Sequence, residues 1–240
     1  MVRAQKNLHQ LELNGRDVPV CLRRNPSARR LILRVEAGRR PDDPDKVAVT
    51  LPRGASDREA LAFVSSKIDW IMKKLAALPD RVGLADGTLI PFLGVEHRIY
   101  HHPGARRGVW REEGSLHVSG QPEHLTRRLL DWIKREARIQ ISERVAEKAA
   151  RIERKAGRIS IRDTRSRWGS CAANGNLSFS WRLILAPEYV FDYVIAHEVS
   201  HLVEHNHGAN FWRVVATLTP EMEQAKYWLR KNGETLHRYG

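Results

Sequence analysis

The chain has 240 residues, 42% of them hydrophobic, which is enough to build the core of one or two domains. No apolar stretch is long enough to span a bilayer, the N-terminal stretch MVRAQKNLHQLELNG lacks the apolar core of a secretory signal, and two distant cysteines exclude a disulfide-rich framework. We therefore expect a soluble, cytoplasmic protein. With 41 Lys and Arg against 28 Asp and Glu, the formal net charge is +13, which favours an anionic partner such as nucleic acid.

The first third of the chain is rich in β-branched and aliphatic residues. Short runs of them predict strands at residues 18–22, 30–35 and 46–51. Ser56 and Glu59 have the spacing of a capping box, and apolar residues from Leu61 to Leu75 recur every three or four positions, which predicts a helix. Further short strands are expected at residues 91–100 and 115–120. We therefore assign residues 1–120 to a β-rich, basic N-terminal region.

The second half begins with a long amphipathic segment. Pro122 is placed to open a helix, apolar residues then recur every three or four positions, and Gly157 marks its end. Residues 158–162 predict another strand. Between Asn176 and Leu183, apolar residues alternate with Ser and Arg, which is the pattern of a half-buried strand.

Two helical regions complete the chain. Pro187 suits the first turn of a helix that we expect over residues 188–203, with a break in the HNHG sequence that follows. Pro220 divides the last helical region. We assign residues 121–240 to a second domain.

Four of the eleven histidines lie in the segment AHEVSHLVEHNHGANFW. His197, Glu198 and His201 form an H-E-x-x-H motif within it. On a helix, residues four apart lie on one face, so both imidazoles can bind one ion. Imidazole nitrogen suits zinc, and Glu198 is placed to reach a water on that ion without binding the ion itself. The pattern predicts a Zn²⁺ site.

A catalytic zinc ion usually has three protein ligands, so the chain must supply one more. His205 is again four residues on, but on a straight helix it lies about 12 Å from His197 along the axis, which is too far for one ion. His207 lies just before Gly208, where the chain can turn back over the metal. We therefore expect His207 as the third ligand, with His205 as the less favoured alternative. A weaker rival is Glu221, twenty residues past His201, because Pro220 before it suits the start of a helix.

Four motifs occur together in the second half, namely RWGSC at 167–171, NLSFSWRLILAP at 176–187, YVIAHEVSHL at 193–202 and NHGANFW at 206–212. This combination is far more specific than H-E-x-x-H alone. It resembles the YgjP-like metal-dependent hydrolases, which are grouped with the SprT-like zinc metalloproteases, and the close resemblance covers about residues 165–212. The resemblance implies a zincin-like metallopeptidase fold of the α+β class, with a small sheet beside the helix that carries the metal ligands.

The resemblance also implies residue roles. It assigns the general base to Glu198 and the metal ligands to His197, His201 and His207. Glu204 and His205 stand where relatives often have His and Pro, so the turn that follows the motif is expected to differ slightly. The family's substrates do not transfer to this chain.

The strand expected over residues 176–183 directly precedes the metal helix. If its edge is exposed, an extended peptide can pair with it beside the metal, which predicts substrate contacts at Asn176, Ser178 and Ser180. The alternative is an ordinary core strand without a free edge.

Several nearby residues have less certain roles in the sequence. Gly169 marks a turn, which either places backbone donors near the site or simply accompanies a packed Trp168, and we favour the second interpretation. We expect Cys171 to be a small buried residue rather than a nucleophile. The candidates for stabilising an oxyanion are Tyr193, Tyr227 and His237.

The sequence as a whole predicts a zinc metallopeptidase that acts on a protein or peptide. The alternative is a nucleic-acid-associated protein, including a protease recruited to DNA, whose metal site is mainly structural. A catalytic site keeps an open coordination position, whereas a structural site is closed by a fourth protein ligand. The basic footprint for nucleic acid would be Arg23, Arg24, Arg29, Arg30, Arg127, Arg128, Lys134, Arg135 and Arg138. No membrane partner is expected.

Overall fold

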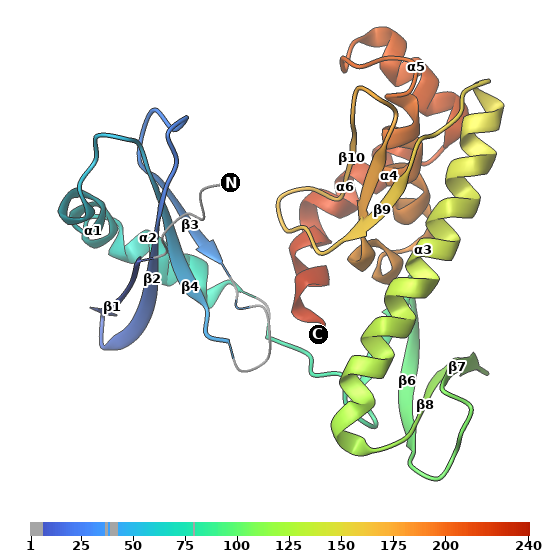
Figure 1. Cartoon of the computed structure of the whole chain (residues 1–240), viewed down its shortest axis with the longest axis horizontal. Coiled ribbons are helices and arrows are strands. Elements are labelled where there is room, and N and C mark those ends of the chain that lie inside the picture. The colour runs from blue at the N-terminus through green and yellow to red at the C-terminus, as the bar shows by residue number, and fades with distance from the viewer. Residues whose placement is uncertain (1–6, 37, 39–42, 79) are drawn as a thin grey trace. The chain divides into compact units, whose positions relative to one another are not determined.

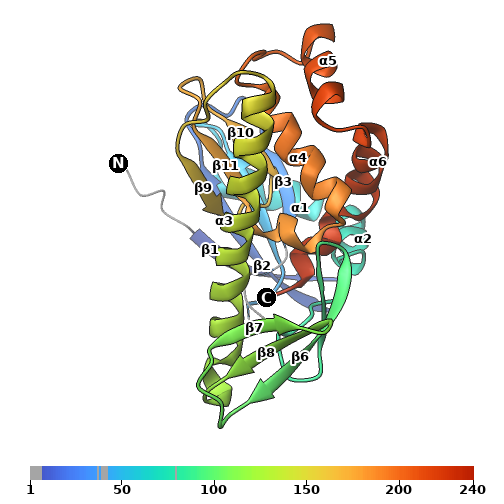
Figure 2. The same cartoon turned by 90° about the vertical axis from the view of Figure 1, so that its right-hand side faces the viewer.

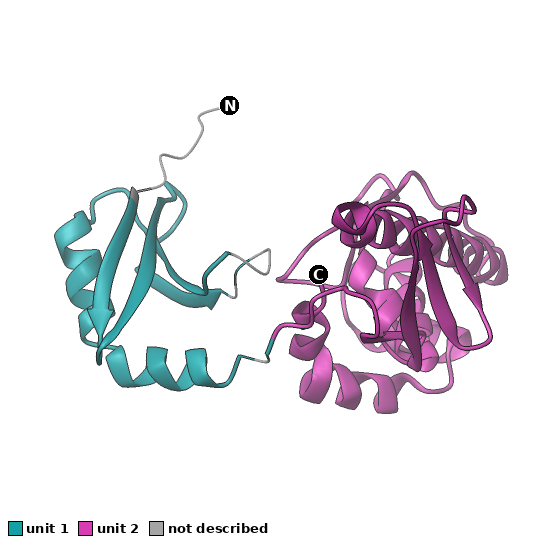
Figure 3. Ribbon diagram, turned by 90° about the horizontal axis from the view of Figure 1, so that it is seen from below, with its two compact units in different colours: residues 1–80 teal, residues 81–240 magenta. Residues whose placement is uncertain are grey.

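Figure 1 shows the protein, a computed structural model that describes residues 7–36, 38, 43–78 and 80–240. The chain forms two compact units divided after Asp80 (Figure 3). Both units combine helices with sheets and the first is rich in strands, so the expectation of an α+β protein with a β-rich N-terminal region is confirmed. The division lies after Asp80 rather than at residue 120, because the strands between these positions pack on the long helix of the second unit.

The first unit contains a four-stranded sheet in the order β1-β2-β4-β3. Its strands are β1 (Asn7–Leu13), β2 (Arg16–Arg24), β3 (Ile32–Glu36) and β4 (Lys46–Leu51). The sequence reading missed β1, which pairs antiparallel with β2. Asn14 and Gly15 join the two strands with positive φ angles, as a tight hairpin turn of the Asn-Gly type requires.

Two helices cover this sheet where the sequence predicted one. The capping box is present, because the Ser56 hydroxyl accepts from the Glu59 N–H at 3.2 Å and the Glu59 carboxylate accepts from the Ser56 N–H at 2.7 Å. The helix that it opens, α1 (Asp57–Ser65), ends before Lys67, whose backbone leaves the helical region, and α2 (Ile68–Ala76) follows. The apolar faces of the helices and the sheet share one core, which includes Val20, Val49, Leu51, Val64 and Ile71.

The second unit begins with another four-stranded sheet, in the order β5-β6-β8-β7. Its strands are β5 (Leu89–Phe92), β6 (Val95–His102), β7 (Val109–Glu112) and β8 (Ser115–Ser119). The hairpin turn at Gly94 lies directly against Pro187, since a Cβ on Gly94 would be 2.8 Å from the Pro187 Cα. The neighbouring Leu93 N–H donates to the carbonyl of Ile184 at 2.6 Å. The sheet is thereby fixed to the segment that leads into the H-E-x-x-H helix.

The long helix α3 (Leu125–Arg151) supports both sheets of the second unit. It follows a short 3₁₀ turn, η1 (Pro122–His124), and ends earlier than the predicted Gly157. Figure 1 shows β6 and β8 beside its first half and β9 beside its second half. Its apolar stripe enters a core shared with both sheets, through Leu129, Ile133, Ala137, Ile141 and Val145.

The second sheet of this unit has three short strands in the order β10-β11-β9. They are β9 (Ile159–Arg162), β10 (Gly169–Cys171) and β11 (Leu177–Ser180), with β10 antiparallel and β9 parallel to β11. The strand predicted to reach Leu183 ends at Ser180, where a 3₁₀ helix, η2 (Trp181–Leu185), begins. The alternation misled the prediction because Arg182 is buried in spite of its charge and donates to the Asp163 carboxylate at 2.9 Å.

The C-terminal part consists of α4 (Glu188–Ser200), α5 (Ala209–Leu218), α6 (Met222–Asn232) and the 3₁₀ segment η3 (Gly233–Arg238). The predicted interruption at Pro220 lies between α5 and α6. A buried ion pair ties α3 to α4, since the Lys148 ammonium lies 2.8 Å from the Asp192 carboxylate and also donates to the Leu218 carbonyl. None of the described helices combines the length and the apolar character that crossing a membrane needs.

Candidate metal centre

The H-E-x-x-H motif lies at the end of a deeply buried helix. Pro187 precedes the first turn of α4, and the helix packs between α3 and α6 (Figure 2). Because neighbours surround it, α4 is apolar on nearly every side, which explains why its sequence lacks a polar stripe. The helix ends at Ser200 rather than at residue 203, so His197 occupies the last turn and His201 is the C-terminal cap.

Three histidines converge just beyond this helix end. The ligand nitrogens of His197, His201 and His207 all lie within 4.8 Å of one another, and the Nε2 atoms of His197 and His207 are 3.1 Å apart. The helix contributes the first two, and the loop between α4 and α5 folds back to bring in the third. Among the described residues, this cluster includes neither His205 nor Glu221.

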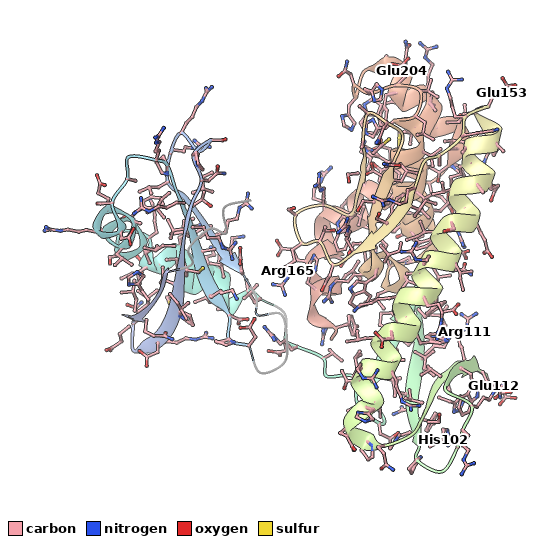
Figure 4. All side chains as sticks on the ribbon, viewed as in Figure 1. His102, Arg111, Glu112, Glu153, Arg165 and Glu204 are labelled. Carbon is pink, nitrogen blue, oxygen red and sulfur yellow. The ribbon has the colours of Figure 1, made fainter. Side chains whose placement is uncertain are left out.

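The loop also orients the second histidine. The Nδ1 atom of His201 lies 3.0 Å from the backbone carbonyl of Glu204, which Figure 4 labels in this loop. A carbonyl can only accept, so Nδ1 carries the proton and Nε2 keeps its lone pair. Metal-binding histidines are commonly oriented in this way. The backbone of Glu204, rather than its carboxylate, therefore supports the cluster.

The ring of His197 is held in the form that binds cations. Burial, followed by the proximity of His201 and His207, lowers the pKa of His197 to about 4, so the imidazole is neutral near pH 7. Its Nδ1 atom is buried with no hydrogen-bond partner among the described residues. A neutral imidazole among two others is a donor set for a metal ion.

Aromatic side chains of α5 enclose the cluster. The ring of Phe211, which is fully buried, lies between 4.5 and 4.9 Å from the rings of all three histidines, measured between centroids. Trp212 lies farther out, and the Lys226 ammonium lies 4.6 Å from the centroid of its ring. The apolar wall restricts water on one side of the cluster.

Glu198 lies beside the cluster but does not belong to it. Its side chain is buried, with 7% of the residue exposed. Burial raises the pKa of Glu198 to about 7, although Arg167 and a hydrogen bond from the Cys171 backbone N–H act in the opposite direction. The carboxyl group can therefore gain or lose a proton near neutral pH, as an acid–base catalyst must.

The strand β10 presses directly against this carboxylate. A Cβ on Gly169 would lie 2.5 Å from the Glu198 Cγ and 2.6 Å from Oε1, closer than any side chain could approach. The sequence favoured a turn at Gly169 beside a packed Trp168. Trp168 does pack against the core, but the turn was wrong, because Gly169 is part of a strand that contacts Glu198. The RWGSC motif was the available signal, but its contact with α4 is not local in sequence.

The predicted substrate strand has no free edge. β11 is the central strand, with β10 on one side and β9 on the other, so its backbone cannot pair with a peptide. The Asn176 side chain instead accepts from the Arg158 N–H at 2.8 Å, and Ser180 is fully buried and caps η2. Ser178 also pairs through its backbone on both sides, with Ser170 in β10 and Ser160 in β9. The edge strands of this sheet are β10 and β9.

The candidates for stabilising an oxyanion, and Cys171, differ in their burial and in their distance from the histidine cluster. Tyr193 is buried with its ring 6.0 Å from that of His197, and burial raises the pKa of its hydroxyl to about 12. Tyr227 is 62% exposed, and His237 stacks on Trp168 at 5.0 Å. Cys171, expected to be buried, is partly exposed. Of the three oxyanion candidates, Tyr193 is the one whose ring the structure places against the cluster.

Three convergent histidines and a buried glutamate, on and beside one helix next to a small sheet, are the arrangement of a metal-dependent peptidase. A family model of the YgjP-like metallopeptidase domain matches residues 35–232. The chain therefore belongs to the YgjP-like metallopeptidase family, as the motifs had indicated, and this family implies a divalent metal ion and a peptide substrate.

Other comparisons add little. No curated protein matches the chain. One solved structure, the crystal structure of the metallopeptidase zymogen of Pyrococcus abyssi abylysin, is similar over 41% of this chain and 97% of its own, with 19% sequence identity and a TM-score of 0.35. A TM-score this low gives no basis for transferring structural detail.

Proposed function

We propose that this protein is a zinc peptidase that uses His197, His201 and His207 as metal ligands and Glu198 as the general base. The observation that carries the proposal is Glu198 itself, which directly follows His197 on α4 and is buried against β10 with a pKa raised to about 7.

The donor set supports zinc. Three imidazole nitrogens are typical of a catalytic zinc site, and Zn–N bonds of about 2.0–2.1 Å at a tetrahedral angle place two ligand nitrogens about 3.3 Å apart. The separation of 3.1 Å between His197 and His207 is compatible with this value. When bound, zinc would lower the pKa of water and polarise a peptide carbonyl.

The number of ligands favours catalysis over a structural role. A structural zinc site is closed by four protein ligands, whereas the cluster found among the described residues has three. This supports the peptidase over a nucleic-acid-associated protein with a structural metal, and no described contact favours that alternative.

The proposed role of Glu198 is proton transfer. As a carboxylate it takes a proton from the attacking water, and as a carboxylic acid it delivers that proton to the leaving amine. A pKa near 7 makes both directions accessible. Tyr193, whose raised pKa keeps its hydroxyl protonated, is our candidate for donating a hydrogen bond to the developing oxyanion.

The edge of β10 is our candidate for the peptide-binding strand. The Trp168 carbonyl accepts from Ser180 N–H and the Ala172 N–H donates to Asn176, so these groups point toward β11. Along a strand, the backbone N–H and C=O groups of successive residues point alternately to the two sides, so those of Gly169 point away from β11.

Cys171 points the same way as Gly169 along β10, and its N–H already donates to Glu198. A peptide that pairs with the remaining outward groups of β10 would therefore lie beside the proposed base. This edge replaces the one that the sequence reading assigned to residues 176–183.

Glu198→Gln separates metal binding from chemistry. Gln keeps the shape of the side chain but cannot accept the proton, so peptide hydrolysis should fall by about 10²- to 10⁴-fold while the zinc content and the melting temperature stay unchanged. Glu221→Gln is the matched control, because this glutamate lies outside the cluster and the variant should keep full activity. An unfolded basic protein is a suitable first substrate.

Two results would contradict the proposal. Undiminished hydrolysis by Glu198→Gln would remove this residue from the mechanism. Loss of zinc in that variant would make Glu198 a support for the metal instead of the base.

A further inference from the structure

A second concave site lies at the other edge of the three-stranded sheet. A pocket of about 390 Å³ is formed where α3, β9 and η2 meet, and β9 is the edge strand on the opposite side from β10. Its lining includes no residue of the histidine cluster and no residue of β10. The pocket is therefore a feature that the peptidase proposal does not use.

Cationic side chains dominate its lining. Lys134, Arg135 and Arg138 come from α3, and Arg162 comes from the end of β9. On a helix, positions three and four apart lie on one face, so the three cations of α3 project together toward β9. Arg138 also donates to the carbonyl of Ile159 at 3.2 Å, which joins the helix to the strand at this point.

The positive charge of the pocket is not neutralised from within. Asp163 is the one carboxylate in the lining, and the guanidinium of Arg182 already lies 2.9 Å from it. Lys134 and Arg135 have no ion-pair partner among the residues that the structure describes. Like charges on one helix face repel each other, so this arrangement costs stability unless an anion offsets it.

One wall of the pocket also carries a neutral donor without a partner. Trp181 belongs to the lining and is 2% exposed, and its indole Nε1 is buried with no hydrogen-bond acceptor within the described part of the chain. A buried N–H without an acceptor is unfavourable, and folded proteins usually satisfy such groups. Trp181 therefore adds to the wall of this cationic pocket a donor whose hydrogen bond is unmet among the described residues.

We propose that this pocket binds a phosphate-bearing anion with at least two negative charges. Guanidinium groups match the geometry of phosphate oxygens and donate two parallel hydrogen bonds, and a lysine adds a point charge. The volume is that of a small-molecule site, which favours a nucleotide- or pyrophosphate-sized ligand over a flat macromolecular surface. A free ligand and a nucleic-acid backbone present the same group, so the experiment has to distinguish them.

Isothermal titration calorimetry with pyrophosphate and with a short single-stranded oligonucleotide tests the proposal. The pocket variant is Lys134→Gln with Arg135→Gln, which keeps good helix formers in α3. The matched control is Arg230→Gln with Lys231→Gln, two exposed cations of the same unit outside the lining. Both variants lose the same formal charge, and equal melting temperatures would show that both are folded.

We expect saturable pyrophosphate binding that weakens at least about tenfold in the pocket variant and changes by less than about twofold in the control. Arg162→Gln, on the facing strand, should weaken binding in the same way. Binding of the oligonucleotide alone, with the same dependence on the variants, would assign the phosphate to a nucleic-acid backbone. The proposal is overturned if neither probe binds, or if the pocket variant and the control lose affinity equally.

Discussion

The contact between Gly169 and Glu198 gives the sharpest test of the site. In Gly169→Ala, the new Cβ would lie 2.5 Å from the Glu198 Cγ, whereas ordinary contact begins at 3.4 Å, so one group must move by about 0.9 Å. Glu198 is buried and β10 is paired with β11, so neither can yield freely. Displacement of a catalytic group by about 1 Å costs about 10²-fold in rate. Overpacking of this kind also costs about 1–3 kcal/mol of stability.

The assay compares peptide hydrolysis, zinc content and the free energy of unfolding in wild type and variant. Hydrolysis should fall about 10²-fold, but zinc should remain stoichiometric because the three atoms nearest the new methyl group all belong to Glu198, which is not a proposed metal ligand. Gly104→Ala is the control, since a Cβ there would meet nothing within 4 Å. Wild-type activity in Gly169→Ala would refute the placement of Glu198 against β10, and loss of zinc would show that β10 supports the metal rather than the base.

Two further predictions concern individual histidines. His207→Ala should reduce zinc affinity by more than about 10²-fold, which exceeds the usual effect of losing a residue that only orients a ligand. His205→Ala should leave the zinc affinity nearly unchanged. Equal losses of bound zinc in the two variants would contradict the proposed ligands. Burial, followed by the charges of Arg182 and Arg165, lowers the pKa of His237 to about 4. Between about pH 6.5 and pH 4, the unfolded chain therefore binds a proton on this residue that the folded chain does not bind. The free energy of unfolding should fall as the pH falls through this range. Denaturation of metal-free protein at pH 7 and pH 5 should show a smaller loss for His237→Gln than for wild type, and an equal loss would show that His237 does not titrate differently in the two states.

The convergence of the three histidines could be predicted because it depends on local sequence. The positions of His197 and His201 follow from helical periodicity alone. The position of His207 follows from a chain reversal that Asn206 and Gly208 indicate. The structure brings these three histidines together and leaves His205 out. The helix is shorter than expected, but the shortening occurs after His201 and does not disturb the geometry.

Parts of the fold were missed although the sequence carried a signal. Asn14-Gly15 between two runs of strand-forming residues is a strong hairpin signal, and it would have predicted β1. The boundary between the two units could not be predicted from such a local signal. It depends on the packing of the apolar faces of β6 and β8 against α3, and the sequence of a strand does not indicate which element it packs against.

The error over residues 176–183 had the largest consequence for function. Alternating Ser and Arg indicate an exposed face only if these side chains lack partners inside the protein. Ser180 is buried as a helix cap, and Arg182 is buried because Asp163 and the carbonyls of Leu236 and Tyr239 accept its hydrogen bonds. These partners lie far away in the sequence, so no local pattern reveals them.

β11 is the central strand of its sheet, and β10 and β9 are the edge strands. The edge strand β10 is also the strand that lacks a side chain at Gly169 and leaves room for Glu198. If one strand bound the peptide and another strand positioned the base, these two tasks would belong to separate segments of the chain. In our proposal one short strand, β10, serves both tasks, so replacement of Gly169 in the middle of RWGSC should impair catalysis before it impairs metal binding.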